Sequence, residues 1–522
     1  MIIFVHRTCC ALLACRCGET KNLLEQPKTV NISDTSQPSS TSTPDYCRFK
    51  IDTCAAPPRR KLPRPFTPKV GKIGLASKMI HEVFEYGFKL RERKYRRVFL
   101  TRPCIYGVFS GRFGGFHPIR DRCTACMRCV QEFPNFCRVD RNPEFFRFAD
   151  SYWIPEDPMT ARATPASTVS YEAATGKIPI KGMGYKEGFA GKGWDSIWTD
   201  MSEIVRPTRD GVYGREYIST LTDLGRKPAH LDFSSSTVQE LARTIELELP
   251  IIFDYLPDKL NSQSILCSIA NAARRTGTSF VASAKQATDL LESECKPIIP
   301  LLSPVEVAES IDRIAGSAAI ELTVYDNDAV ALIRKTNPRA PISIRLPLTK
   351  DAEQATIDLV KKGVDAIHLF ANYHGEGWDS QDPMFVKDLI HDVHRRLVKE
   401  CLRDQITIIA SGGITLAEHV PKAIACGADL VGLDTTVLVA LQVEFLGECK
   451  SQQEGRIKPD QFDVNWGQQR LVNLLASWHD QLIEVLSAMG MRDVRRLRGD
   501  VGRAMFNEDL EREAFAEIMH RT

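Results

Sequence analysis

The feature that most constrains this chain is a regular alternation of strand-like and helix-like segments, which begins near residue 245. Eight apolar runs lie at residues 250–256, 279–284, 297–302, 319–325, 341–348, 366–372, 406–412 and 430–435. Between them are segments with helical periodicity, such as SILCSIANAARR and DAEQATIDLVKKG. Eight strands that are each followed by a helix within roughly 200 residues predict a (β/α)8 TIM barrel. A doubly wound open sheet is the structural alternative.

Composition excludes several classes of protein. The formal net charge of +2 over 522 residues argues against a protein that coats nucleic acid, because such proteins carry a large basic excess. The sequence has no run of eighteen apolar residues, so we expect no membrane span. Sixteen cysteines are too few for a disulfide scaffold in a chain of this size. We therefore expect a cytoplasmic globular protein.

Three cysteines, Cys123, Cys126 and Cys129, form a C-x2-C-x2-C run. This spacing lets three thiolates face inward from one tight loop, which suits an iron–sulfur cubane. Two-cluster ferredoxins have a further cysteine four residues after the third, before a proline, and here that position is Phe133. The sequence thus predicts one [4Fe-4S] cluster. Cys137 is the nearest candidate for the fourth ligand and Cys104 is the next; Cys54, a three-iron cluster, a zinc site and free thiols are the alternatives.

These patterns divide the chain into five expected regions. Residues 1–60 should be a disordered or targeting tail, since the first stretch is apolar but short and residues 31–45 are rich in Ser, Thr and Pro. Residues 61–158 should form a small ferredoxin-like iron–sulfur domain, and residues 159–240 an irregular segment leading to the barrel. The barrel is expected over residues 241–445. A C-terminal helical extension is expected over residues 446–522, where LVNLLASWHDQLIEVLSAMG has helical spacing.

A glycine-rich turn follows the seventh strand, in ITIIASGGI at residues 406–414. The loops after strands seven and eight are the usual phosphate site of such barrels, because glycines let backbone N–H groups approach phosphate oxygens. A tight turn without a ligand is the alternative. Arg345, on the fifth strand, could hold a phosphate or a reduced flavin. His374, after the sixth strand, and Asp434, after the eighth, could move protons, although a histidine in a polar loop is often only a surface residue.

The chain resembles the FMN-binding domain of the glutamate synthase family, and more closely its ferredoxin-fused members that have no amidotransferase domain. The best match is the segment GMGYKEGFAGKGWDSIWTDMSEIVRPTRDGVYGREYISTLTDLG at residues 182–225. The cysteine run before it, and SGGI with GADLVGLDTTVLVAL (427–441) after it, occur in the family's order. Three loops depart from the family's pattern: ANYHGEG follows strand six, LPDKLNSQ strand one and ASAKQA strand two.

The resemblance implies an FMN-containing oxidoreductase that acts on CH–NH2 donors. Electrons would pass from the cluster to FMN, and the reduced flavin would form glutamate from 2-oxoglutarate and ammonia. Arg345 stands where the family usually has a lysine, and we expect Arg345 and His374 to be catalytic. By match of position, the FMN phosphate ligands would be Ser411, Gly412, Gly413, Gly432 and Thr435.

Two other functions fit the same sequence. A degenerate, non-catalytic barrel could serve as a subunit of a larger redox complex, and a barrel enzyme without flavin could act on a phosphorylated metabolite. The expected partners are an electron donor, such as ferredoxin or a reductase subunit, a small-molecule substrate and further copies of the chain in an oligomer. No nucleic acid is expected as a partner.

Overall fold

The computed structural model describes most of the second half of the chain and separate pieces of the first. The described residues are 49–59, 66–70, 104, 106–109, 118–123, 126–132, 137–142, 165–178, 193–199, 215–228, 243–256, 262–291, 297–379, 383–446, 456–458, 461–506 and 509. Residues 1–48 of the tail expected over residues 1–60 lie outside them, as does much of the domain expected over residues 61–158. Residues 182–192 and 200–214, from the segment that carries the family resemblance, also lie outside them.

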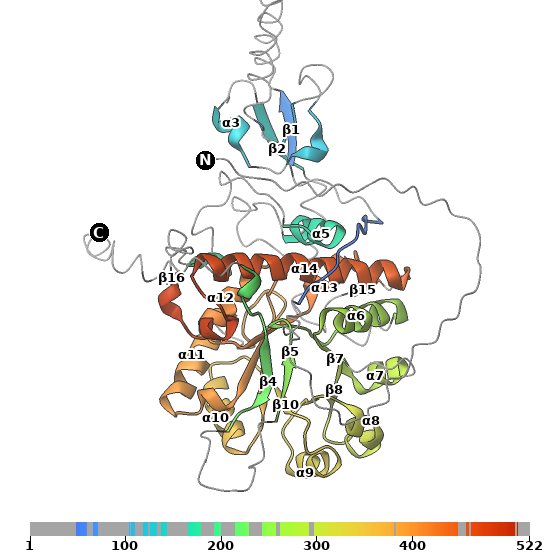
Figure 1. Cartoon of the computed structure of the whole chain (residues 1–522), viewed down its shortest axis with the longest axis vertical. Helices are drawn as coiled ribbons and strands as arrows, with labels where there is room; N and C mark the ends of the chain where they lie inside the picture. Colours follow the sequence, from blue (N-terminus) through green and yellow to red (C-terminus); the bar gives the residue numbers. More distant parts are fainter. Residues whose placement is uncertain are drawn as a thin grey trace, which may run out of the picture. The chain divides into compact units, whose positions relative to one another are not determined.

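Eight parallel strands close into a barrel in chain order, as predicted (Figure 1). They are β6 (Ile251–Phe253), β7 (Phe280–Ser283), β8 (Ile298–Leu302), β9 (Ile320–Leu322), β10 (Ile342–Pro347), β11 (Ala366–Phe370), β12 (Thr407–Ser411) and β13 (Leu430–Leu433). The helices after them are α6 (Gln263–Thr276), α7 (Ala284–Leu291), α8 (Ile311–Gly316), α9 (Asn327–Thr336), α10 (Ala352–Lys361), α11 (Val386–Lys399), α12 (His419–Cys426) and α13 (Thr435–Ala440). The TIM barrel prediction is confirmed and the open sheet is excluded.

The N-terminal end of the barrel is closed by a hairpin. Strands β4 (Thr222–Arg226) and β5 (Arg243–Leu247) pair in antiparallel fashion immediately before the barrel begins. Leu224 and Leu247 from this hairpin join the apolar cluster formed by inward-facing residues of the barrel strands. The Thr407 hydroxyl fixes the hairpin by donating to the Gly225 carbonyl at 2.9 Å. Any opening of the barrel is therefore expected at its other end, where the strands terminate.

The segment expected to be irregular contains several short elements. They are α5 (Pro165–Thr175), β3 (Ile197–Thr199), and β4 of the closing hairpin. The helix α5 packs against α14 (Val464–Ala488) of the C-terminal extension, and β3 pairs with β16 (Ala504–Phe506) near the end of the chain. Because the partners of α5 and β3 are distant in sequence, local periodicity does not reveal these two elements.

The C-terminal extension is led by α14 (Val464–Ala488), which packs on α6 and α5 and gives the predicted helical segment. Arg470 of α14 is fully buried. Its guanidinium donates to the carbonyls of Ala56 at 2.8 Å, Ala440 at 2.5 Å and Ser170 at 3.4 Å. One side chain thus ties α14 to the segment at residues 49–59, to α13 and to α5.

Two pieces of the expected iron–sulfur domain are also described. Strands β1 (Phe66–Val70) and β2 (Cys137–Arg141) pair in antiparallel fashion, and helix α3 (Arg128–Glu132) carries the third cysteine of the run.

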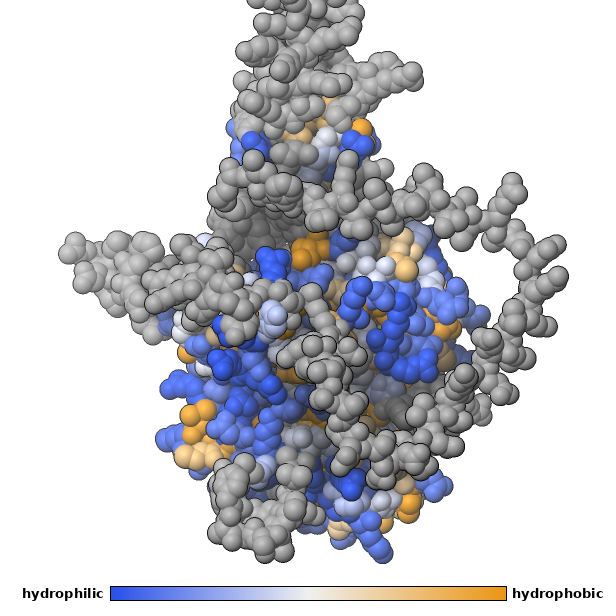
Figure 2. All heavy atoms as spheres, viewed as in Figure 1, coloured by the Kyte–Doolittle hydropathy of each residue, from blue (hydrophilic) through white to orange (hydrophobic). Residues whose placement is uncertain are grey.

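Within the described ranges, no helix is long and apolar enough to cross a bilayer. The face drawn in Figure 2 is mostly hydrophilic, with hydrophobic side chains scattered over it in small groups.

We expect the Arg470→Met variant to be less stable than the wild type by about 2–5 kcal/mol, because it leaves three buried carbonyl groups without a donor. Urea unfolding followed by circular dichroism measures the difference. Arg275→Met is the matched control, since Arg275 lies exposed on α6 and donates to Gln469 and Asp52 at the surface. An equal loss in the free energy of unfolding in both variants would show that the buried contacts of Arg470 contribute no more to stability than the exposed contacts of Arg275.

Candidate functional site

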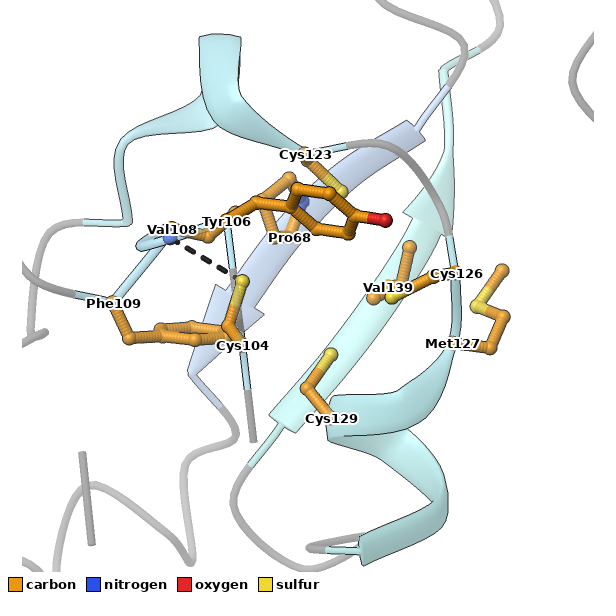
Figure 3. A pocket seen from close by; sticks show the side chains of 10 residues that line it. All are labelled: Pro68, Cys104, Tyr106, Val108, Phe109, Cys123, Cys126, Met127, Cys129 and Val139. Atoms are coloured by element: carbon orange, nitrogen blue, oxygen red, sulfur yellow. Dashed lines mark hydrogen bonds between the residues drawn. The ribbon is translucent and has the colours of Figure 1, made fainter. Parts of the chain in front are cut away.

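A hollow in the N-terminal part of the chain is lined by four cysteine side chains. Three come from the C-x2-C-x2-C run, and the fourth is Cys104. Figure 3 shows the four sulfur atoms directed toward a common space. The Val108 amide donates to the Cys104 sulfur at 3.3 Å and holds it there. The remaining lining residues are mainly apolar or aromatic: Pro68, Tyr106, Val108, Phe109, Met127 and Val139.

Local backbone conformation brings the three cysteines of the run to one hollow. Met127 lies between the second and third cysteine and has a φ of 54°, in the left-handed region. It turns the chain into α3, so that Cys129 lies on the first turn of this helix. Cys123 follows a short 3-10 turn, η1 (Arg120–Arg122). The run therefore makes a tight loop, as its spacing predicts.

Cys137, the first-ranked candidate for the fourth ligand, begins strand β2 and is not among the residues that line the hollow. Its thiol forms a hydrogen bond with Cys129, and this contact together with burial raises the pKa of Cys129. Burial also raises the pKa of Cys104, and the neighbouring thiols of Cys126 and Cys129 add to the effect. Cys104 thus lines the hollow with the three cysteines of the run, whereas Cys137 contacts Cys129 and belongs to the same apolar cluster as Cys104 and Cys129.

This donor set fits an iron–sulfur cubane, which is held by four thiolates at its corners. In the part of the chain that is described, no three Cys, His, Asp or Glu side chains converge closely enough to hold a single metal ion. The ligands of a cubane lie farther apart than those of one ion, because the irons and sulfides occupy the space between them. The four thiols that could serve as such ligands line one apolar hollow.

Inside the barrel, a layer of charged side chains lies near the C-terminal ends of the strands. Arg345 on β10 forms a two-fold ion pair with Asp254, at 2.7 and 3.0 Å, and a third contact with Glu321 at 3.1 Å. The Nδ1 atom of His368 lies 2.9 Å from Glu321, and its Nε2 atom lies 3.0 Å from the Ser411 hydroxyl. We call these five residues the barrel network.

The charges of the barrel network compensate one another. Burial alone would raise the pKa of Asp254, but the facing charges of Arg345 and His368 hold that pKa well below its usual range. Burial would likewise lower the pKa of Arg345, and the two carboxylates instead raise it. The guanidinium also lies over the Phe370 ring at 4.7 Å. Arg345 is thus placed within the barrel, as predicted, but its donors are engaged by internal carboxylates.

His374 lies in the loop after β11, in a tight polar turn. The Asn372 side-chain oxygen accepts hydrogen bonds from the amides of His374 and Glu376, each at 2.9 Å, and its amide nitrogen donates to Glu376 at 3.0 Å. The Nε2 atom of His374 is buried. The turn places His374 beside the Ser-Gly-Gly-Ile loop, because the carbonyl carbon of His374 lies 3.1 Å from where a Cβ on Gly413 would be.

The Ser-Gly-Gly-Ile loop packs closely on this turn. Gly412 and Gly413 have φ values of 93° and 70°, which glycine adopts readily. A Cβ on Gly412 would lie 2.7 Å from the carbonyl oxygens of Ala371 and Asn372, and one on Gly413 would lie 2.5 Å from the Gly375 Cα. The glycines are therefore required by close approach of the chain's own backbone.

The other predicted phosphate ligands also have internal partners. Ser411 belongs to the barrel network, and a Cβ on Gly432 would lie 2.9 Å from its Cβ atom. The backbone amide and the hydroxyl of Thr435 both donate to the carboxylate of Asp434, the residue that precedes α13. Burial, with the neighbouring charge of Asp254, raises the pKa of Asp434 to about 7.

Part of the segment that carries the family resemblance covers this corner of the barrel. Trp194 is buried, and its indole nitrogen donates to the Gly413 carbonyl at 3.1 Å. It stacks on His419 with the ring centroids 5.6 Å apart, and its own carbonyl accepts from Lys422 at 2.7 Å. Residues 193–199 thus lie against the Ser-Gly-Gly-Ile loop, which explains why these two motifs occur together.

Sequence reasoning missed most of the barrel network. Asp254, Glu321 and His368 are polar residues inside apolar strand runs. Their unusual position in these runs is the sequence signal that could have indicated a polar cluster inside the barrel. In FDYL, IELT and IHLF each polar residue is flanked by apolar ones. Their meeting becomes evident only when the barrel closes, since strands β6, β9 and β11 are not neighbours in the sheet.

Comparisons with known proteins find relatives that match most of the chain. The model of a family described as "Conserved region in glutamate synthase" matches residues 326–492. The archaeal-type glutamate synthase [NADPH] of Dehalococcoides mccartyi is 24% identical over 447 residues, which cover 72% of this chain and 86% of that protein. The archaeal glutamate synthase [NADPH] of Archaeoglobus fulgidus is 24% identical over 459 residues, covering 73% and 85%.

Over most of its length the chain is therefore similar to glutamate synthases. This similarity supports an oxidoreductase of glutamate synthase type. Among solved structures, a mandelate oxidase matches with a TM-score of 0.34 at 15% identity, over 58% of this chain and 97% of that one. A likeness of that size carries no argument about cofactor or substrate.

We expect Cys104→Ser to lower the iron content of the anaerobically reconstituted protein more than Cys137→Ser does. The wild type should hold about four iron and four sulfide per chain. Cys104 lines the hollow, whereas Cys137 contacts Cys129. Cys426→Ser, a buried cysteine on α12, is the matched control for the loss of any thiol. A larger loss in Cys137→Ser would return the fourth ligand to that residue, and stoichiometric zinc without iron would exclude the cluster.

Arg345→Met is expected to destabilise the chain by about 3–5 kcal/mol, because it leaves two carboxylates buried without their cation. Replacing Arg345, Asp254 and Glu321 together by Met, Asn and Gln should recover much of that loss, since no uncompensated charge then remains. Unfolding in urea at pH 7 measures all three proteins. If the single variant is as stable as the wild type, the barrel network does not hold the barrel together.

Proposed function

We propose that the chain is an iron–sulfur electron-transfer component of glutamate synthase type, which works within a larger redox complex. The observation that carries the proposal is the set of four thiols around one apolar hollow, Cys104, Cys123, Cys126 and Cys129. A [4Fe-4S] cluster bound there would accept and release one electron at a time. The expected partners are an electron donor, such as a ferredoxin or a reductase subunit, and the acceptor chain of the complex.

The residues around the hollow suit that role. The Val108 amide donates to the Cys104 sulfur, and hydrogen bonds to ligand sulfurs favour their charged form. The apolar and aromatic lining would keep water from the site, and solvent access and hydrogen bonding are the main influences of a protein on the potential of a cluster. The paired strands β1 and β2 form one side of the hollow, which they line with Pro68 of β1 and Val139 of β2.

A second candidate function is the complete family reaction, in which glutamate forms from 2-oxoglutarate and ammonia at FMN in the barrel. The names of the relatives, which match over most of this chain, favour it. In this reaction Arg345 and His374 would be the catalytic groups. However, three groups of the predicted phosphate corner already have partners within the chain: the Ser411 hydroxyl, the Thr435 hydroxyl and the Thr435 amide. These partners disfavour binding of a phosphate by Ser411 and Thr435.

Glutamate formation distinguishes the two functions. We expect the purified chain, supplied anaerobically with dithionite-reduced methyl viologen, 2-oxoglutarate and ammonium, to form glutamate far more slowly than about 1 s⁻¹. Loss of a single oriented donor typically lowers a rate by a factor of about 10²–10³, and here several are engaged elsewhere. The Archaeoglobus fulgidus relative, assayed in parallel, is the positive control. Turnover at or above about 1 s⁻¹ would establish the family reaction instead.

Electron transfer itself is tested separately. The reconstituted chain should show one reduction step by electron paramagnetic resonance after dithionite addition, and mixing with an oxidised ferredoxin should reoxidise it. Cys123→Ser should abolish the electron paramagnetic resonance signal and the reoxidation by ferredoxin, whereas Cys426→Ser should leave both unchanged. A chain that carries no iron after reconstitution would contradict the proposed function.

A further inference from the structure

The corner of the barrel between β12 and β13 is the place where the family resemblance puts the FMN phosphate. Two loops and the start of α13 meet there, and glycines are present at the expected positions. The groups that would have to bind a phosphate are backbone amides and hydroxyls that face one open space.

At the start of α13, the backbone amide and the hydroxyl of Thr435 could bind an anion, but both already donate to the Asp434 carboxylate. The carboxylate of Asp434 accepts the Thr435 amide, and the Thr435 hydroxyl donates to the same oxygen at 3.1 Å. The Asp434 side chain is buried, being only 4% exposed as a residue. A carboxylate in this position makes the contacts that a phosphate oxygen would make, and it carries charge of the same sign.

A second carboxylate lies beside the first. Asp254 follows strand β6, the neighbour of β13 in the sheet, and it is close enough to raise the pKa of Asp434. Arg345, the guanidinium of the barrel network, is paired with Asp254 and Glu321. An incoming dianion would therefore meet negative charge without a free cation among the barrel network residues.

On the β12 side, the Ser-Gly-Gly-Ile loop packs closely on neighbouring protein segments. The backbone of Gly413 approaches Gly375 so closely that even a Cβ would lie 2.5 Å from its Cα atom. Trp194 covers the Gly413 carbonyl, and the Thr436 hydroxyl donates to the carbonyl of Ile414 at 2.7 Å. The glycines of this loop serve close packing between protein segments.

We propose that Asp434 takes the place of the FMN phosphate in this chain, so that the barrel does not bind FMN through the loops after its seventh and eighth strands. Asp434 is an internal anion that caps α13 and completes the packing of the corner. The barrel then acts as a framework, and redox chemistry is confined to the iron–sulfur centre. This inference concerns the barrel alone, so it can fail without affecting the cluster.

The test is equilibrium binding of FMN, and of riboflavin as a probe that lacks the phosphate, followed by flavin fluorescence at pH 8. The wild type should be purified without flavin and should bind FMN no more tightly than riboflavin. Asp434→Gly frees the Thr435 amide and removes the charge, so it should bind FMN at least tenfold more tightly than the wild type, with riboflavin unchanged. Asp434→Asn removes only the charge and should give a smaller gain.

Asp463→Gly is the matched control, since Asp463 is exposed and caps the N-terminus of α14 in the same way. It should leave binding of both flavins as in the wild type. Wild-type protein that retains stoichiometric FMN, or that binds FMN tenfold more tightly than riboflavin, would overturn the inference whether or not the variants fold. Iron content measured in the same samples shows whether the cluster, and with it the proposed function, is affected.

Discussion

The pairing of buried charges inside the barrel is the interaction on which the rest of this structure depends. A (β/α)8 barrel must fill its interior with side chains, and most such interiors are filled by branched apolar residues. Here the upper layer holds a guanidinium, two carboxylates and an imidazole, each with partners within hydrogen-bond distance. Such a layer is stable only when it is complete, because any one charge left alone would be strongly unfavourable.

This internal pairing explains how the site differs from what the family resemblance implies. Arg345 was expected to face a ligand, and its position on β10 agrees with that expectation. Its hydrogen-bond donors, however, are occupied by Asp254 and Glu321, and the hydroxyl of Ser411 is occupied by His368. Residues that could serve a cofactor instead serve one another. The barrel fold is the one that the family resemblance predicts. The side chains of Arg345 and Ser411, however, contact other protein side chains inside it.

Local sequence predicts well those features that depend on neighbouring residues. The eight strands were evident from short apolar runs, and the tight cysteine loop from its spacing, because both are encoded within a few residues. The partners of these features were not evident. Cys104 lies 19 positions before Cys123 in the sequence, and its place beside the run depends on a loop that carries no motif. Asp254 meets Arg345 only through closure of the barrel, whereas Glu321 lies on β9, the neighbour of β10. The helix α5 packs against α14 and α13, which are distant from it in sequence.

The position of α14 has a consequence for how the chain is made. Arg470 joins α14 to Ala56 and Ser170, which precede it by 414 and 300 residues. Synthesis on the ribosome proceeds from the N-terminus, so the segment at residues 49–59 and the helix α5 meet this partner only after almost the whole chain has been made. Contacts so distant in sequence form slowly. Until then the apolar faces of α5 and α6 remain uncovered, and chaperones are expected to shield them during synthesis.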